Sequence, residues 1–152
     1  MSPSREPSPS GDESEAIPVP RDVAPLDPVL QFLCALANES HLELSIRLTL
    51  AGGTLSGTLV GGQQYFRAIA QATRSVLSGP EEGKDGLGQY FDFMAEIYEE
   101  QRDDADDRRI VFIHLKDAWL FTPGAPPLLV GEWRGRLDAI QGWSIGTYSE
   151  QE

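Results

Sequence analysis

The sequence predicts an α+β fold: an antiparallel, strongly curved sheet or small open barrel with helices packed on one side, behind a disordered N-terminal tail. Residues 42–60 alternate between apolar and polar side chains around a glycine pair, which is typical of a β-hairpin. Residues 63–78 and 87–102 instead carry apolar side chains at helical spacing, and several short strands follow. A hairpin, two helices and then strands favour a curved sheet with these middle helices on one face.

The first helix is predicted to begin at Asp27. Its carboxylate can cap the helix, and Pro28 follows at the first helical position, where the missing N–H of proline costs nothing. The apolar residues of this helix then recur at helical spacing: Val29, Leu30, Leu33, Leu36 and Ala37. The helix is expected to end at residues 38–40.

The hairpin follows directly. In its first strand the apolar residues that share one face are Leu42, Leu44, Ile46, Leu48 and Leu50. The turn falls at residues 51–53, and the second strand, residues 54–60, places Leu55 and Leu59 on one face with Gly57 between them. A glycine inside a strand predicts strong bending or a close approach of another backbone.

The remaining elements are two helices and the last strands. A polar loop with Gly83, Gly86 and Gly88 is expected between the helices. Residues 110–115 and 118–121 are predicted as strand segments separated by a turn or bulge at residues 116–117. Residues 123–127 form a loop, and residues 128–137 and 143–148 supply the final strands.

The chain divides into two parts by composition. Residues 1–25 are rich in proline, serine and acidic residues and offer almost nothing to a core, so burial cannot offset the entropy of ordering them. We therefore expect a disordered tail over residues 1–25 and a single α+β domain over residues 26–152.

Charge and cysteine content limit the partners. Twelve Lys and Arg against 24 Asp and Glu give a net charge of −12, which opposes binding to nucleic acid and to anionic membrane surfaces. No apolar run approaches the length that spans a bilayer, and none follows the first basic residue as in a secretory signal. The single cysteine, Cys34, suits a reducing cytoplasm.

The residues that could carry chemistry are few. Cys34 lies within an apolar helix stripe, and the two histidines, His41 and His114, have no further metal ligands at suitable spacing. The acidic run at residues 99–107 lacks the spacing of a calcium loop, and neither glycine pair is followed by a phosphate-binding motif. We expect neither an enzyme nor a cofactor or metal site.

The C-terminal part is rich in rings and carries a pair of arginines. Tryptophan and arginine are favoured at binding surfaces, which makes four residues candidates for a partner contact: Trp133, Arg134, Arg136 and Trp143. Strand alternation places Trp133 on one face and both arginines on the other. The alternative is that the rings fill the core and the arginines pair with Glu132 or Asp138.

Three segments of the chain resemble the gas vesicle accessory protein U (GvpU) family: LTLAGGTLSGTLVGGQQYF at residues 48–66, FIHLKDA at residues 112–118 and EWRGRLDAIQGWSIG at residues 132–146. The similarity extends in order and spacing over most of residues 28–148 and leaves out the tail. It implies a cytoplasmic, non-enzymatic protein at the gas vesicle surface, whose partners are the vesicle shell or other gas vesicle proteins, with possible self-association. It also implies a shell that presents polar and acidic groups, which arginine would suit.

Two other functions remain open from the sequence. The protein could be an assembly chaperone that holds the apolar shell protein before incorporation. The hairpin, helices and later strands are also similar to Sm-like small barrels that bind nucleic acid, although the negative charge opposes that role.

Overall fold

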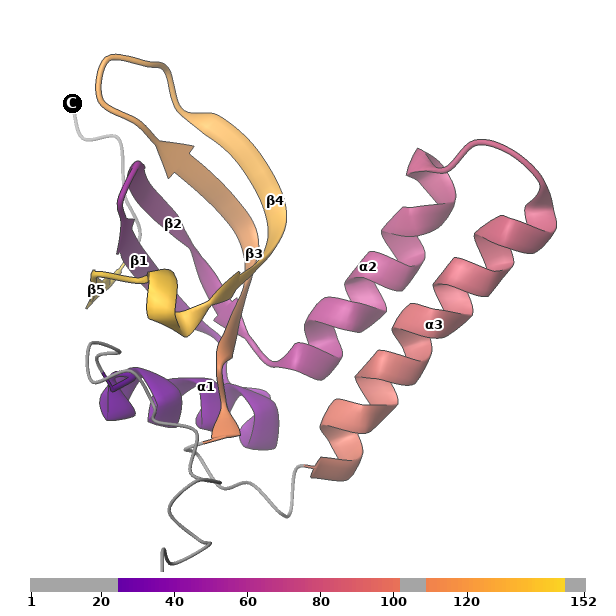
Figure 1. The fold of residues 1–152 in the computed structure, drawn as a ribbon, viewed down its shortest axis with the longest axis horizontal. Helices are drawn as coiled ribbons and strands as arrows, with labels where there is room; N and C mark the ends of the chain where they lie inside the picture. The colour runs from indigo at the N-terminus through magenta and orange to yellow at the C-terminus, as the bar shows by residue number, and fades with distance from the viewer. Residues whose placement is uncertain (1–24, 102–108, 147–152) are drawn as a thin grey trace, which may run out of the picture.

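The computed structural model describes residues 25–101 and 109–146 (Figure 1). The predicted tail lies outside the described residues except for Pro25, and so do residues 102–107 of the acidic run, Arg108 and residues 147–152 at the C-terminus.

The predicted fold class is confirmed. Three α-helices accompany a five-stranded antiparallel sheet with the strand order β4-β3-β2-β1-β5 (Figure 1). In chain order the elements are α1 (Pro28–Ser40), β1 (Leu44–Leu50), β2 (Gly53–Val60), α2 (Gly62–Val76), α3 (Glu81–Glu100), β3 (Phe112–Phe121), β4 (Leu128–Arg136), the short 3-10 helix η3 (Leu137–Ala139) and β5 (Gly142–Ile145).

The predicted start of α1 is confirmed by the hydrogen bonds of its cap. One oxygen of Asp27 accepts from the backbone N–H groups of Val29 at 2.9 Å and Leu30 at 3.3 Å. These donors have no partner inside the helix, so the carboxylate satisfies them. The helix ends at His41, whose φ of 56° turns the chain toward β1.

Close backbone approach explains the glycine within β2. A Cβ on Gly57 would lie 3.1 Å from both the Ala118 Cα and the Lys116 carbonyl oxygen. On the facing strand Asp117 has a φ of 52°, and the β2–β3 pairing shifts register here. The predicted bend and bulge are confirmed, and β3 continues through the bulge as one strand.

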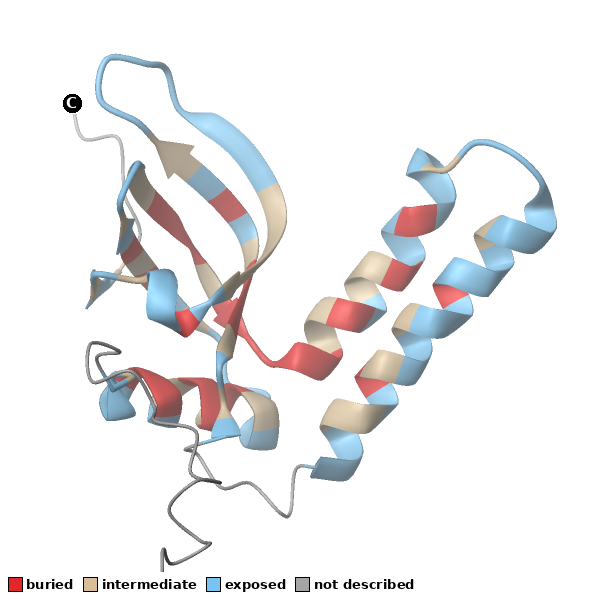
Figure 2. Cartoon of the chain, in the orientation of Figure 1, coloured by how far each residue is buried: buried red, intermediate tan, exposed pale blue. Residues whose placement is uncertain are grey.

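The core lies between α1 and the inner face of the sheet (Figure 2). Its buried members are Leu30, Cys34, Ala37, Ile46, Leu48, Leu55, Leu59, Ile113, Leu115, Ala118 and Leu137. Among the described residues, neither α2 nor α3 contributes a member of this cluster. The alternation predicted for β1 and β2 therefore identifies the core face correctly from Leu44 onward, whereas Leu42 lies before β1 and is exposed.

The middle helices form a hairpin that projects from the sheet and touches it near the start of α2 (Figure 1). Phe66 stacks on Phe91 with ring centroids 6.1 Å apart, and the ring of Tyr98 lies against Gly62. The small residues Gly88 and Ala95 are buried on the α2–α3 side. This hairpin is held by ring contacts at its base and small residues along its length.

The helix α3 begins at Glu81, six residues before the start that its apolar spacing predicts. The expected polar loop over the three glycines is therefore wrong. Glu81 and Glu82 suit the positive end of the helix dipole, and Lys84 pairs with Glu81 at 3.5 Å. Asp85 also meets Arg74 of α2 at 3.7 Å. These interactions favour helix where glycine alone opposes it.

Candidate functional site

The cysteine does not have the surroundings of a nucleophile. Cys34 is 3% exposed within the core, and burial raises the pKa of its thiol to about 12. A thiolate, which is the reactive form, is therefore absent at physiological pH.

His114 lies in a cage of aromatic rings beneath the helical hairpin. Its ring centroid is 4.8 Å from that of Tyr65, 5.8 Å from Phe66 and 5.5 Å from Tyr98. The Nε–H of Arg134 donates to its Nε2 at 3.2 Å, which places the histidine proton on Nδ1. Burial first, and the charge of Arg134 second, lower the pKa of His114 to about 3. This imidazole stays neutral and joins the hairpin to the sheet rather than transferring protons.

The other polar candidates have structural partners as well. His41 Nδ1 lies 3.1 Å from the side-chain nitrogen of Gln63, which also donates to the carbonyl oxygen of Asn38 at 2.8 Å. Within residues 25–101 and 109–146, no three His, Cys, Asp or Glu side chains come together as a possible metal site.

The two candidate tryptophans occupy separate places. Trp133 is half-buried against the core and stands opposite Leu115, and its ring covers Gly135. Trp143 on β5 is also half-buried, and its indole N–H donates to the second oxygen of Asp27 at 2.8 Å. Both rings therefore tie a late strand to the rest of the fold.

The two candidate arginines lie on the outer face of β4, away from the core, as alternation predicts. Arg134 is half-buried, with its guanidinium carbon 3.5 Å from the ring centroid of Phe112, in addition to its bond to His114. Arg136 is exposed and pairs with Asp138 at 2.6 Å. Of the four candidates, Arg136 is the one most open to a partner.

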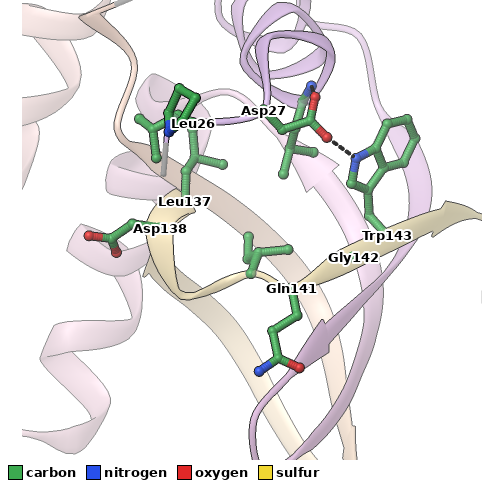
Figure 3. A pocket seen from close by; sticks show the side chains of 10 residues that line it. Leu26, Asp27, Leu137, Asp138, Gln141, Gly142 and Trp143 are labelled. Carbon is green, nitrogen blue, oxygen red and sulfur yellow. Dashed lines mark hydrogen bonds between the residues drawn. The ribbon is translucent and has the colours of Figure 1, made fainter. Parts of the chain in front are cut away.

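A pocket of about 470 Å³ lies between the start of α1, η3 and β5 (Figure 3). Its walls combine apolar side chains, including Leu26, Leu30 and Ile140, with polar ones, and the bond between Asp27 and Trp143 crosses one side. The carboxylate of Asp138 lies on the other side. The lining of this pocket has no cysteine, serine, histidine or basic side chain.

A second surface was missed by sequence reasoning. We call residues 118–131 the strand arm: it comprises the end of β3, the loop that follows and the start of β4. Trp119 is 42% exposed, Leu128 and Leu129 are each 59% exposed, and Val130 is 36% exposed. Trp119 and Leu129 stand opposite each other in the β3–β4 pairing, so their side chains form one apolar patch on the outer face.

The strand arm carries no charged residue over its 14 positions, although the whole chain has a net charge of −12. That uncharged run is the sequence signal that could have identified it. Its strand β4 pairs with β3 alone among the described strands and is therefore a sheet edge. An exposed apolar edge is a typical site for binding another protein.

Comparison with known families agrees with the resemblance. The model of the family described as "Gas vesicle protein GvpU-like" matches residues 27–148. The chain belongs to this gas vesicle protein family. The matched region begins at Asp27, the cap of α1, and covers every helix and strand described above. No curated protein and no solved structure matches the chain.

For this GvpU-like chain, no helix in the described part is long and apolar enough to cross a membrane.

Proposed function

We propose that this protein binds gas vesicles and influences their clustering or assembly, without catalysing a reaction. The observation that carries the proposal is the strand arm: an exposed, uncharged, apolar sheet edge on a strongly acidic member of a gas vesicle family. Repulsion between like charges opposes contact over most of an acidic surface. The strand arm avoids that repulsion and offers apolar area, so it is the surface best suited to bind a neighbouring protein.

Arg136 provides the polar part of the proposed contact. It lies on β4, as do Leu128 and Leu129, and it is exposed. Its pair with Asp138 is at the surface, where such pairs are weak, so a carboxylate on a partner can compete for the guanidinium. Trp133, Arg134 and Trp143 support this contact indirectly, because they hold β4 and β5 in place. Repetition of the same groups on a shell would add avidity to each weak contact.

Co-flotation with isolated gas vesicles tests the proposal. The wild-type protein is expected to rise with the vesicles, and the variant Leu129→Ser is expected to stay largely in the lower fractions. Arg136→Ala should weaken co-flotation without loss of folding, whereas Arg134→Ala also removes the contact with His114 and is less informative. Thr122→Ser, an exposed change in the same loop, is the matched control. Wild-type protein that never rises with vesicles would contradict the proposal.

The exposed strand arm also favours a second function, that of an assembly chaperone for the unassembled shell protein. Apolar surface is what a chaperone needs to hold an apolar subunit. The two functions differ in which form of the shell protein is bound. A chaperone would capture unassembled subunit and fail to rise with intact vesicles, and the Leu129→Ser variant would then lose capture instead of co-flotation.

A further inference from the structure

The helix α3 has an apolar stripe that is exposed at Leu87 and Tyr90 and half-buried at Met94 and Ile97. Leu87, Tyr90, Met94 and Ile97 recur three to four residues apart, so they share one face of the helix. Leu87 is 37% exposed and Tyr90 is 54% exposed, and Phe93 beside them is 56% exposed. A different face of α3, marked by Gly88 and Ala95, packs toward α2. The stripe is therefore additional to the contact that forms the helical hairpin.

Carboxylates lie beside the C-terminal part of the stripe. The helix carries one lysine against seven acidic residues: Glu81, Glu82, Asp85, Asp92, Glu96, Glu99 and Glu100. Three of these, Glu81, Asp85 and Glu99, form ion pairs with Lys84, Arg74 and Arg67. Asp92, Glu96 and Glu100 have no ion pair among the described residues. Asp92 lies on the opposite side of the helix from Tyr90, whereas Glu96 and Glu100, four residues apart, form a row beside Phe93 and Ile97. Glu96 and Glu100 stand three and seven residues after Phe93, beside the stripe.

We propose that this face of α3 binds an amphipathic helix from another protein, whose apolar side is flanked by lysine or arginine. The apolar stripe supplies the area for a helix packed against a helix, and the row of free carboxylates supplies the preference for basic flanks. This surface is separate from the strand arm and does not depend on it. A protein with two separate binding surfaces can connect two partners.

Charge opposes two occupants from the chain itself, α3 of a second copy and the N-terminal residues. A second copy of α3 would bring a second row of carboxylates next to the first, and like charges at an interface oppose binding. Residues 1–24 contain Arg5 and Arg21 against five acidic residues, Glu6, Asp12, Glu13, Glu15 and Asp22, a net charge of −3. Neither occupant complements the carboxylate row, whereas a basic helix does.

Fluorescence anisotropy with the full-length protein and two synthetic peptides tests this proposal. Each peptide has about 18 residues with leucines on one helical face, and the flanks are lysine in one and glutamate in the other. The lysine peptide is expected to bind, with an affinity that falls as salt rises, and the glutamate peptide is expected not to bind. Equal binding of both peptides, or of neither, would overturn the proposal.

Variants locate the binding on α3. Tyr90→Ser with Phe93→Ser should weaken binding of the lysine peptide by about tenfold or more, because exposed apolar anchors carry most of such an interface. Glu96→Lys with Glu100→Lys should reverse the preference between the peptides. Glu39→Lys, an exposed change at the end of α1, is the matched charge control and should have little effect. Because all these positions are exposed, the variants should keep the wild-type melting temperature. If Tyr90→Ser with Phe93→Ser instead abolished self-association in sedimentation and left peptide binding unchanged, the occupant would be a second copy and the proposal would be wrong.

Discussion

Two regions of the molecule bury different kinds of side chain: the sheet together with α1, and the helical hairpin of α2 and α3. The first buries large aliphatic residues such as Ile46, Leu48 and Leu59, which have no exposed surface. The hairpin buries mainly small residues, including Gly88 and Ala95, and leaves several of its large apolar side chains in contact with solvent. Burial of apolar area is the main stabilising term in folding, so the sheet half carries most of the stability.

Function can therefore evolve outside the core without loss of the fold. The hairpin and the strand arm both extend beyond the core, and both present apolar side chains that folding does not require. Surfaces of this kind can change to fit a partner while the core stays constant. Changes in the core should therefore affect stability more than changes in the hairpin or outside the domain.

The largest effect is expected for Ile46→Asp. Ile46 is fully buried at the centre of β1, and an unpaired carboxylate there should cost more than about 4 kcal/mol, enough to abolish cooperative folding. Thr49→Asp, on the exposed side of the same strand, is the control and should fold. Thermal unfolding followed by circular dichroism measures both. A soluble Ile46→Asp protein with a cooperative transition would mean that this face is not the core.

A smaller effect is expected at the base of the helical hairpin. In Gly62→Ala the new methyl group would overlap the ring of Tyr98, and such overpacking should lower the free energy of unfolding by about 1–3 kcal/mol. In Gly83→Ala no atom lies within 4 Å of the new methyl group, so the higher helix propensity of alanine should raise stability by up to ~1 kcal/mol. If α3 begins at Glu81, chemical denaturation should show a lower free energy of unfolding for Gly62→Ala and a higher one for Gly83→Ala. Destabilisation by Gly83→Ala would indicate a loop there.

The role of Asp27 predicts a pH-dependent stability. Its hydrogen bond from Trp143 is the main cause that lowers its pKa below the ordinary 3.8, and the bonds from Val29 and Leu30 act in the same direction. The stabilisation by the charged group should therefore be complete above pH 3.8 and lost as the pH falls through the lower folded-state pKa. Asp27→Ala should cost about 1 kcal/mol at neutral pH, whereas Asp27→Asn should keep most of the cap and lose the pH dependence. Tryptophan fluorescence during acid titration checks this, and an identical acid transition in Asp27→Asn would contradict it.

The smallest effect is expected for deletion of residues 1–25. Their composition offers almost nothing to a core, so the melting temperature should stay nearly unchanged. Calorimetry of the full-length and shortened proteins measures this. A large fall in melting temperature would show that these residues contribute to the domain and that its boundary lies earlier.

Local patterns allowed much of the fold to be predicted from the sequence. The alternation in β1 and β2 identified the core face because a half-buried strand must separate apolar from polar side chains. The cap at Asp27 was predictable because its donors lie two and three residues away. The start of α3 was not predictable from the sequence. Glycine favours loops locally, and the ion pair of Asp85 with Arg74 that supports the helix depends on tertiary structure.

The binding surfaces were harder to predict for the same reason. A run such as Leu128, Leu129 and Val130 is typical of a buried strand, and only the position of β4 at the sheet edge leaves it exposed. The bond between Trp143 and Asp27 joins residues 116 positions apart, which no local pattern indicates. Arg134 and Trp133 were correctly assigned to opposite faces, but the sequence does not show that Arg134 donates a hydrogen bond to His114.

Hydrogen exchange with and without intact gas vesicles tests most directly the claim that the sheet core folds the protein and the strand arm binds. The account predicts slower exchange on vesicle binding in residues 128–130, whose strand lies at the edge of the sheet, and no change in β1 and β2, which are already protected inside the sheet. Slower exchange confined to other segments, or no change anywhere in a sample that rises with the vesicles, would contradict it.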